Sequence, residues 1–164
     1  MEKDKKIIIK QSKDADTRSA EGLVTKKQLL QNTYSHISDV NNIGNWLVDK
    51  FVEQLNQHDH TKIDYIDEFY EDFTNQLQAD NKPNFKEMPW FKNRHMTERH
   101  HLNDSVPDDV NLLDVLEMVI DCTAAGLARS GSVYDITIPV DVLNKAINNT
   151  KQLIIDNTEV DENK

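Results

Sequence analysis

The sequence predicts an all-α protein, a single-domain helical bundle of about five main helices preceded by a short extended arm. Apolar residues recur every three or four positions over most of the chain, as they do on one face of an amphipathic helix. Only Lys6–Lys10 (Lys-Ile-Ile-Ile-Lys) has the composition of a short strand. Because 164 residues fit one domain, we expect an arm over residues 1–24, a helical domain over residues 25–155 and a disordered acidic tail over residues 156–164.

The first predicted helix begins at a capping box in which Thr25 is the N-cap and Gln28 reaches back to it. Its apolar stripe includes His36 and extends to Phe51 at helical spacing. Gly44 near the middle favours a kink or a break. The stripe therefore places His36 on a face that should be buried.

Apolar spacing, together with residues that typically begin or end helices, predicts three further helices. Apolar spacing predicts one over residues 66–77, and the most apolar helix should begin near Pro107, where acidic residues complement the helix dipole. Gly131 should end that helix, and residues 132–137 read as a loop or short strand. Pro139 fits the first turn of a last helix.

Composition excludes several classes of protein. The formal net charge of −10, without a strong cluster of Lys and Arg, disfavours nucleic-acid binding. The single cysteine, Cys122, excludes an internal disulfide framework and a cysteine-based zinc finger. No apolar run approaches the roughly 20 residues that span a bilayer, and no secretory signal is recognisable. We therefore expect a cytoplasmic protein without a membrane partner, and a homodimer stays open.

The histidines are confined to one part of the chain, and two carboxylates, Asp59 and Asp121, are notable beside them. The six are His36, His58, His60, His95, His100 and His101. Asp59 follows His58 directly, and Asp121 sits on the most apolar predicted helix, four residues after Glu117. A carboxylate on such a helix is costly to bury unless it is paired or bound to a cation. The plainer alternative is an ion pair between Asp121 and Arg129.

The order of His36, His58-Asp59 and Asp121 predicts a divalent metal site. Imidazole nitrogen and carboxylate oxygen suit a borderline or harder ion such as Mn, Fe, Co, Ni or Zn. Helical bundles build such sites from facing side chains across the core. Each residue also has an ordinary explanation, since His36 could be a hydrogen-bonded core histidine and His58-Asp59 a solvated turn.

These residues resemble the pattern of the HD superfamily of metal-dependent phosphohydrolases. The run His58–Lys62 also fits the recurrent His-Asp-x-x-Lys form of that superfamily. Over Thr33–Lys151 the chain is similar to a family of bacteriophage-encoded HD-like proteins. The stretches that carry this likeness are His36-Ile37, His58–Phe69, Arg99–His101 and Leu116–Asp121.

The resemblance implies a helical bundle of the HD type that hydrolyses a nucleotide or a related small phosphoester with metal-activated water, in the host cytoplasm if the protein is phage-encoded. The expected ion is Mn, Co, Ni, Fe, Zn or Mg. The expected metal ligands are His36, His58, Asp59, His101 and Asp121, with His101 favoured over His95 and His100. We expect catalytic roles for Asp59, Lys62 and Glu117. We expect substrate contacts from Lys62, Arg94 and Arg99.

Other readings stay open. A non-catalytic phage protein could bind a host protein and keep the metal only as a structural staple. In a third reading the histidines bind no metal and make ordinary hydrogen bonds. Lys62 could equally be a solvated lysine, and Glu117 could orient a ligand or form a salt bridge. Arg18 in the N-terminal arm is a weaker candidate for a phosphate contact.

Overall fold

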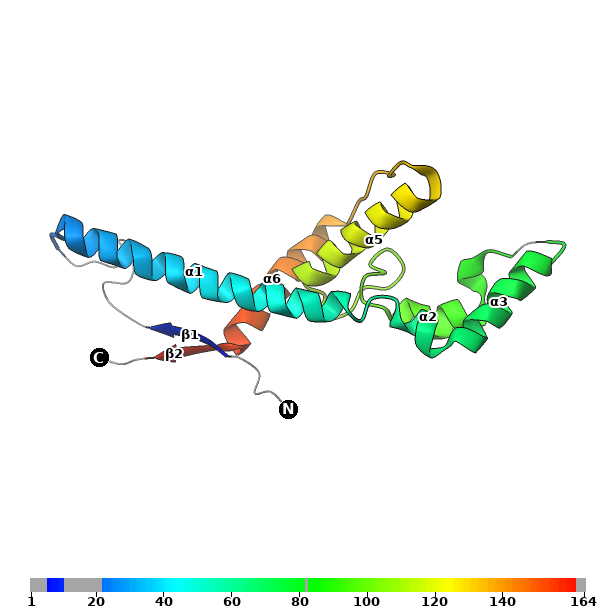
Figure 1. Cartoon of the computed structure of the whole chain (residues 1–164), viewed down its shortest axis with the longest axis horizontal. Coiled ribbons are helices and arrows are strands. Elements are labelled where there is room, and N and C mark those ends of the chain that lie inside the picture. The colour runs from blue at the N-terminus through cyan, green and yellow to red at the C-terminus, as the bar shows by residue number, and fades with distance from the viewer. Residues whose placement is uncertain (1–5, 11–21, 82, 162–164) are drawn as a thin grey trace. The chain divides into compact units, whose positions relative to one another are not determined.

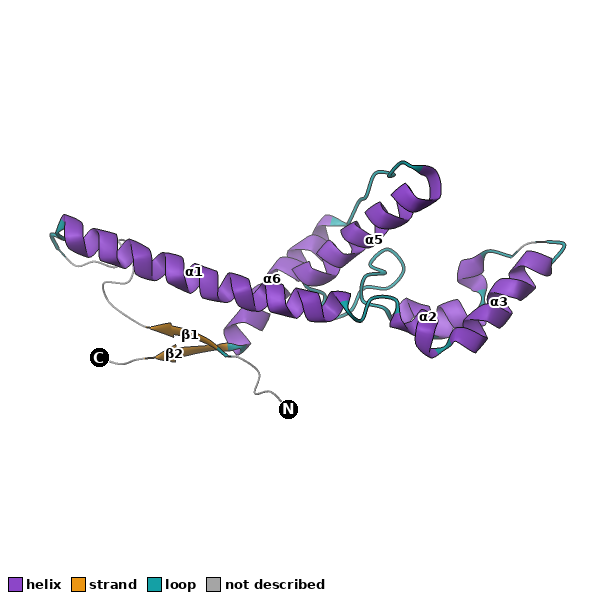
Figure 2. Ribbon diagram, in the orientation of Figure 1, coloured by secondary structure: helices purple, strands orange, loops and turns teal. Residues whose placement is uncertain are grey.

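The computed structural model describes residues 6–10, 22–81 and 83–161, and Arg18 therefore lies outside the described residues. Helices dominate these residues, and the prediction of an all-α fold is confirmed (Figures 1 and 2). The elements in chain order are β1 (Ile7–Lys10), α1 (Lys26–Leu55), α2 (His60–Asp64), α3 (Ile66–Gln78), η1 (Phe85–Glu87), α4 (Pro89–Asn93), η2 (His95–Thr97), α5 (Leu112–Ser130), α6 (Val140–Asp156) and β2 (Thr158–Asp161). Among the described residues, no helix combines the length and the apolar composition that crossing a membrane requires.

The chain divides into two compact units. One unit comprises Met1–Glu53 together with Lys151–Lys164, and the other comprises Gln54–Thr150. The first holds the two strands and most of α1, and the second holds α2 to α5 with the first part of α6. Every histidine except His36 belongs to the second unit.

The two strands of the first unit form a small parallel sheet. The register runs from Ile7 opposite Thr158 to Lys10 opposite Asp161, which confirms the predicted strand near the N-terminus. The disordered tail expected over residues 156–164 is wrong for Thr158–Asp161, because this segment forms β2. Pairing supplies the hydrogen-bond partners that a lone β1 strand would lack, and residues 162–164 lie outside the described part.

Helix α1 begins as predicted. The Thr25 backbone N–H donates to Oε1 of Gln28 at 3.0 Å, and the Gln28 backbone N–H donates to Oγ1 of Thr25 at 3.3 Å. The helix is not interrupted at Gly44, so the expected break is absent there. His36 is exposed, which corrects the prediction of a buried face at that position. The physical reason is that α1 buries few of its residues, Asn32 and Trp46 among them.

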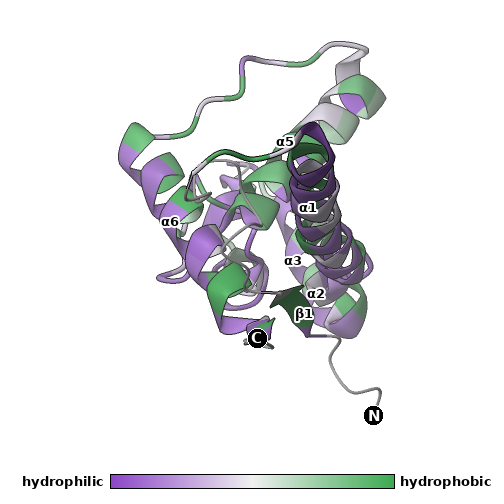
Figure 3. Ribbon diagram, turned by 90° about the vertical axis from the view of Figure 1, so that its left-hand side faces the viewer, coloured by the Kyte–Doolittle hydropathy of each residue, from purple (hydrophilic) through white to green (hydrophobic). Residues whose placement is uncertain are grey.

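The second unit has a small apolar core where α5, α6 and the preceding loop meet. Its buried members are Leu102, Val110, Met118, Val142 and Ala146. The Leu112 backbone N–H at the start of α5 donates to Oγ1 of Thr150 at 2.8 Å, which joins the start of α5 to the second half of α6. Figure 3 shows α6 alternating between hydrophilic and hydrophobic residues, as an amphipathic helix does.

Helix α5 begins five residues later than predicted from Pro107. Asn111 is its N-cap: the Asn111 side chain accepts from the Leu113 backbone N–H at 2.8 Å, and Asp114 accepts from the Asn111 backbone N–H at 2.9 Å. This capping box satisfies the orphan amide groups of the first turn, so the helix starts there. Gly131 ends the helix at a φ of 70°, as predicted.

The buried face of α5 is acidic. Asp114, Glu117 and Met118 are its buried residues, whereas Leu116 and Ile120 are 45% and 42% exposed. The apolar stripe that predicted the helix therefore does not mark its buried side. Polar partners from elsewhere in the unit satisfy the two carboxylates.

Aromatic side chains of α3, η1 and α4 form a second packed group. Trp90 is 1% exposed and stacks on Phe69, with 4.3 Å between ring centroids. Its backbone N–H donates to Asp72 at 2.6 Å, which fixes the start of α4 against α3. Phe91, next to Trp90 in α4, is also buried, at 6% exposed.

Candidate metal centre

His58 and Asp59 lie in the turn that joins α1 to α2. The His58 backbone N–H donates to the Leu55 carbonyl at 3.1 Å, so the turn continues directly from the last residue of α1. Asp59 is the N-cap of α2 and has left-handed backbone angles, φ 58° and ψ 19°. Asp tolerates this region better than most residues, and such conformations cluster at functional sites.

His58, Asp59 and His100 form a cluster that could hold a metal ion. One ligand atom from each lies within 4.8 Å of the others. Nε2 of His58 is 3.6 Å from Oδ2 of Asp59, and Nε2 of His100 is 3.9 Å from Oδ1. Two imidazole nitrogens and a carboxylate oxygen are the donor set that divalent transition metals prefer.

Three further side chains border this cluster. Oδ1 of Asp121, on α5, lies 3.6 Å from Nε2 of His58. Nε2 of His95, on η2, lies 3.7 Å from Oδ1 of Asp59. The same nitrogen of His95 is 2.9 Å from Nε2 of His101. The carboxylate of Asp59 is thus central, because nitrogens of three histidines face it.

Glu117 contacts the Nδ1 atoms of two of these histidines. Its Oε1 lies 2.9 Å from Nδ1 of His58 and 3.2 Å from Nδ1 of His100. Nε2 of Gln54 donates to Oε2 of Glu117 at 2.5 Å and to Oδ1 of Asp114 at 3.0 Å. One buried carboxylate therefore orients both imidazoles so that their Nε2 atoms turn toward Asp59, as carboxylates do around metal-binding histidines.

The other two histidines have the same orientation. Nδ1 of His95 is 3.0 Å from Oγ1 of Thr61, and Nδ1 of His101 is 3.9 Å from Oδ2 of Asp104. The three histidines that face Asp59, and His101 beside His95, thus direct Nε2 into the cluster and Nδ1 away from it. A chance cluster of surface histidines has no reason to share this arrangement.

The charges of the site are set by burial and by these contacts. Burial opposes ionisation of Glu117, but hydrogen bonds from His100, Gln54 and His58 outweigh it and lower its pKa to about 2. Burial also opposes ionisation of Asp59. The pKa of Asp59 is nevertheless lowered, because the Lys62 ammonium donates a hydrogen bond to it and carries a positive charge. Both carboxylates are anionic near neutral pH.

Two histidines differ in their affinity for a proton. Burial lowers the pKa of His95 to about 3, and positive charge on His101 and Lys62 contributes. Burial acts in the same direction on His100, but the bond to Glu117 outweighs it and raises that pKa. The neutral form that His95 adopts is the form that binds metals.

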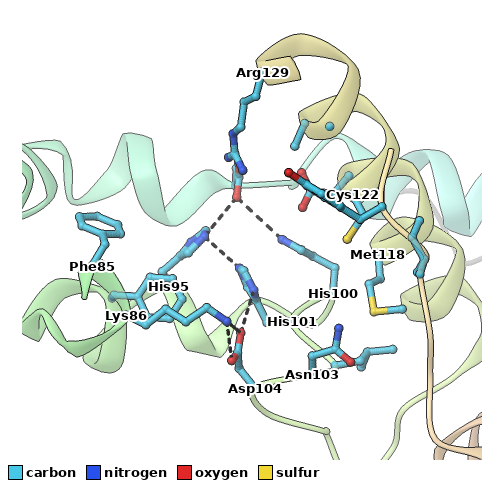
Figure 4. A pocket seen from close by; sticks show the side chains of 18 of the residues that line it. Phe85, Lys86, His95, His100, His101, Asn103, Asp104, Met118, Cys122 and Arg129 are labelled. Atoms are coloured by element: carbon cyan, nitrogen blue, oxygen red, sulfur yellow. Dashed lines mark hydrogen bonds and ion pairs between the residues drawn. The ribbon is translucent and has the colours of Figure 1, made fainter. Parts of the chain in front are cut away.

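The cluster forms part of a pocket of about 710 Å³ (Figure 4). The histidines on its wall are His95, His100 and His101, beside Asp59 and Asp121. Its aromatic lining is Phe69, Phe73, Phe85 and Phe91. The loop after α5 contributes Tyr134, Asp135, Ile136 and Thr137. The candidate metal centre is therefore open to a small molecule.

Two predicted substrate contacts have other partners. Arg94 is paired with Glu68, at 3.0 and 3.1 Å, and lies over the Tyr65 ring. Arg99 makes a two-pronged pair with Asp114, at 2.8 Å for both bonds. Neither arginine lines the pocket. A guanidinium that is paired with a carboxylate in this way is held in place.

The structure brings together most of the predicted site residues. His58, Asp59 and Asp121 meet at the centre, and Lys62 bonds to Asp59. His101, favoured as a ligand over its neighbours, contacts His95, and His100 takes the position beside Asp59. His36 is exposed and belongs to the other unit, so its role as a ligand stays a prediction.

Sequence reasoning missed Gln54 and Asp114 altogether. One signal could have found Asp114: it precedes Glu117 by three residues, and Asp121 follows Glu117 by four, which is an acidic stripe at helical spacing. Gln54 carries no comparable signal, because an amide near a helix end is common.

Comparison with known proteins identifies a family that the chain matches. Residues 25–158 match the family described as "Family of unknown function (DUF5662)". No curated protein and no solved structure matches the chain. The matched range contains every residue of the candidate metal centre.

Proposed function

The chain belongs to this family of unknown function, and we propose from its metal centre that it is a metal-dependent phosphohydrolase acting on a nucleotide or a related small phosphoester. One observation carries the proposal. Three histidines, His58, His95 and His100, direct Nε2 toward the Asp59 carboxylate, and their Nδ1 atoms face Glu117 or Thr61. This arrangement prepares nitrogen and oxygen donors for a cation at the wall of an open pocket.

The ligands proposed for the ion are His58, Asp59 and His100, with Asp121 completing the set from α5. This donor set fits Mn, Fe, Co, Ni or Zn better than Ca, which takes oxygen ligands. A divalent ion held there would supply a nucleophilic water near neutral pH and a positive charge for a phosphoryl oxygen. The sequence resemblance to HD phosphohydrolases agrees with this chemistry.

Glu117 takes a positioning role in this proposal, in place of the catalytic role expected from the sequence. A carboxylate whose pKa is about 2 is a poor proton donor near neutral pH. Its oxygens are also occupied by His58, His100 and Gln54. Glu117 therefore fixes the orientation of two ligands and does not take part in proton transfer.

Lys62 keeps its expected place near the substrate. Its ammonium bonds to Asp59 and lines the pocket. It orients the Asp59 carboxylate and adds positive charge beside the ligands, where an anionic phosphoester would bind.

The open pocket favours an enzyme over a protein in which the metal is only a structural staple. Structural metal sites are closed by protein ligands, whereas catalytic sites keep a position free for water or substrate. Here the cluster borders a pocket of about 710 Å³, large enough for a small phosphoester.

The test is to purify the full chain without chelator, quantify bound metals and assay phosphate release. The panel contains nucleoside mono- and triphosphates, each with Mn, Co, Ni and Mg. We expect release that falls at least about 100-fold in Asp59→Ala, and that is retained in Asp80→Ala, an exposed aspartate outside the pocket. Absence of metal, with no release above Asp59→Ala, would refute the proposal. Bound metal without release would favour the non-catalytic alternative.

A further inference from the structure

We propose that Arg129 binds the phosphate group of the substrate and is the anion subsite of the pocket. This inference rests on the proposed function, since it names a residue that holds the substrate of the same site. It replaces Arg94 and Arg99, which the sequence suggested for this task.

The position of Arg129 is the first argument. It lies in the last turn of α5 and lines the pocket that contains Asp59 and the histidines. Figure 4 shows its side chain extending from the end of α5 toward the centre of the pocket. A phosphate beside the candidate metal ligands would therefore be within the reach of a long guanidinium side chain.

The second argument is that Arg129 has no competing ion-pair partner among the described residues. The other two cations on the pocket wall are engaged, Lys62 with Asp59 and Lys86 with Asp104 at 2.7 Å. In the part of the chain that the structure describes, the Arg129 guanidinium forms no ion pair with a carboxylate. The ion pair with Asp121 that the sequence left open is thus absent there. A guanidinium that no carboxylate contacts retains its donors for an anionic ligand.

The backbone that carries Arg129 is held firmly. The Ser130 hydroxyl donates to the Gly126 carbonyl at 3.1 Å and contacts the Ser132 carbonyl at 3.2 Å. The chain after the helix passes so close to Gly126 that an added Cβ would lie 2.8 Å from the Ser132 oxygen. The end of α5 and the start of the loop are therefore fixed together, which limits where the guanidinium can move.

The aromatic part of the pocket lining defines the rest of the ligand. The aromatic side chains of Phe69, Phe73, Phe85 and Phe91 face the same pocket. A flat ring would pack on these side chains while a phosphate elsewhere in the same molecule pairs with the guanidinium in two-pronged fashion. The substrate class is therefore a phosphomonoester that also carries a flat ring, and a nucleoside monophosphate fits this description through its base.

The test measures binding of inorganic phosphate to the full chain loaded with Mn²⁺, by isothermal titration calorimetry. In Arg129→Gln we expect the phosphate Kd to rise about 10- to 100-fold, because a charge-assisted hydrogen bond is lost. The Mn²⁺ Kd should stay unchanged, which also shows that the site remains folded. Arg129→Lys should fall between the two, since lysine keeps the charge but not the two-pronged geometry.

Arg94→Gln is the matched control, because it removes the same charge from a residue outside the pocket. It should bind phosphate as the unmodified protein does. Equal phosphate binding by Arg129→Gln and the unmodified protein would overturn the inference. So would an equal loss in Arg94→Gln, or no phosphate binding by the unmodified protein with or without Mn²⁺.

The two proposals fail in different ways. If phosphate binding depends on Arg129 but no ester is hydrolysed, the phosphohydrolase is wrong and the anion subsite stands. If esters are hydrolysed with an unchanged KM in Arg129→Gln, the phosphohydrolase stands and the anion subsite is wrong.

Discussion

Oε1 of Glu117 lies 2.9 Å from Nδ1 of His58, on the side of the imidazole that faces away from Asp59. This contact leaves Nε2 of His58 as the nitrogen available to a cation. The same oxygen is 3.2 Å from Nδ1 of His100. A single buried carboxylate thus couples a residue of the turn before α2 to one of the loop before α5.

The first prediction concerns Glu117→Gln, which keeps the shape of the side chain and removes its charge. The amide cannot accept equally from both histidines, so we expect the affinity for Mn²⁺ or Zn²⁺ to fall about 10- to 100-fold. Isothermal titration calorimetry measures this change. Glu68→Gln is the control, because Glu68 pairs with Arg94 outside the pocket. Equal affinity in both variants would contradict the positioning role.

Metal removal should lower thermal stability. A ligand that binds only the folded protein adds about 2.7 kcal/mol to the free energy of unfolding at a concentration of 100 Kd. We therefore expect a higher midpoint of thermal unfolding with a bound divalent ion, and reversal by a chelator. Asp59→Asn should lose most of this increase, while Asp80→Asn keeps it. A midpoint that does not respond to metal or chelator would count against the centre.

Features that depend on neighbouring residues were predictable from the sequence. The capping box of Thr25 and Gln28 and the helix end at Gly131 involve residues at most four apart. Local hydrogen bonds and backbone preferences determine such features, so a single sequence suffices. The pairing of β1 with a segment about 150 residues away was not predictable, because a strand pattern does not name its partner.

The buried face of α5 shows a second limit. Leu116 and Ile120 mark an apolar stripe, but Asp114 and Glu117 are the buried residues. Their burial is sustained by Arg99, His58 and Gln54, and the contact between Glu117 and His58 joins residues 59 positions apart. The pattern of His58, Asp59 and Asp121 indicated the site, whereas the choice of His100 over His101 depends on how a loop folds.

Asp114 should be among the most important residues for stability. It is fully buried, caps α5 and accepts two bonds from Arg99. Asp114→Ala leaves the Arg99 guanidinium without its buried partner, and we expect a loss of about 3–5 kcal/mol in the free energy of unfolding. Asp109→Ala removes only an exposed partner of the same arginine and should cost less than about 1 kcal/mol. Urea unfolding compares the two, and similar losses would contradict this assignment.

Two helical glycines should respond oppositely to alanine. At Gly126 an added Cβ would lie 2.8 Å from the Ser132 oxygen and 3.3 Å from Cα of Val133, so the loop must move. We expect Gly126→Ala to destabilise the protein by about 1–3 kcal/mol despite better helix propensity. At Gly44 nothing lies within 4 Å, and alanine should stabilise by up to about 1 kcal/mol. The midpoint of thermal unfolding, measured for both variants, tests this prediction. A higher midpoint for Gly126→Ala would show that the contact with Ser132 is not tight.

The last prediction concerns the protonation of His95 in the metal-free protein. Its pKa is lowered from 6.5 to about 3 in the folded state, chiefly by burial. Between these values the unfolded chain binds a proton that the folded protein does not, so this residue makes stability fall as the pH falls from 6.5 toward 3. NMR should show a neutral His95 ring at about pH 5. In urea unfolding, His95→Gln should lose less stability than the unmodified protein over the same range. A His95 ring that titrates near 6.5 would contradict the burial seen in the structure.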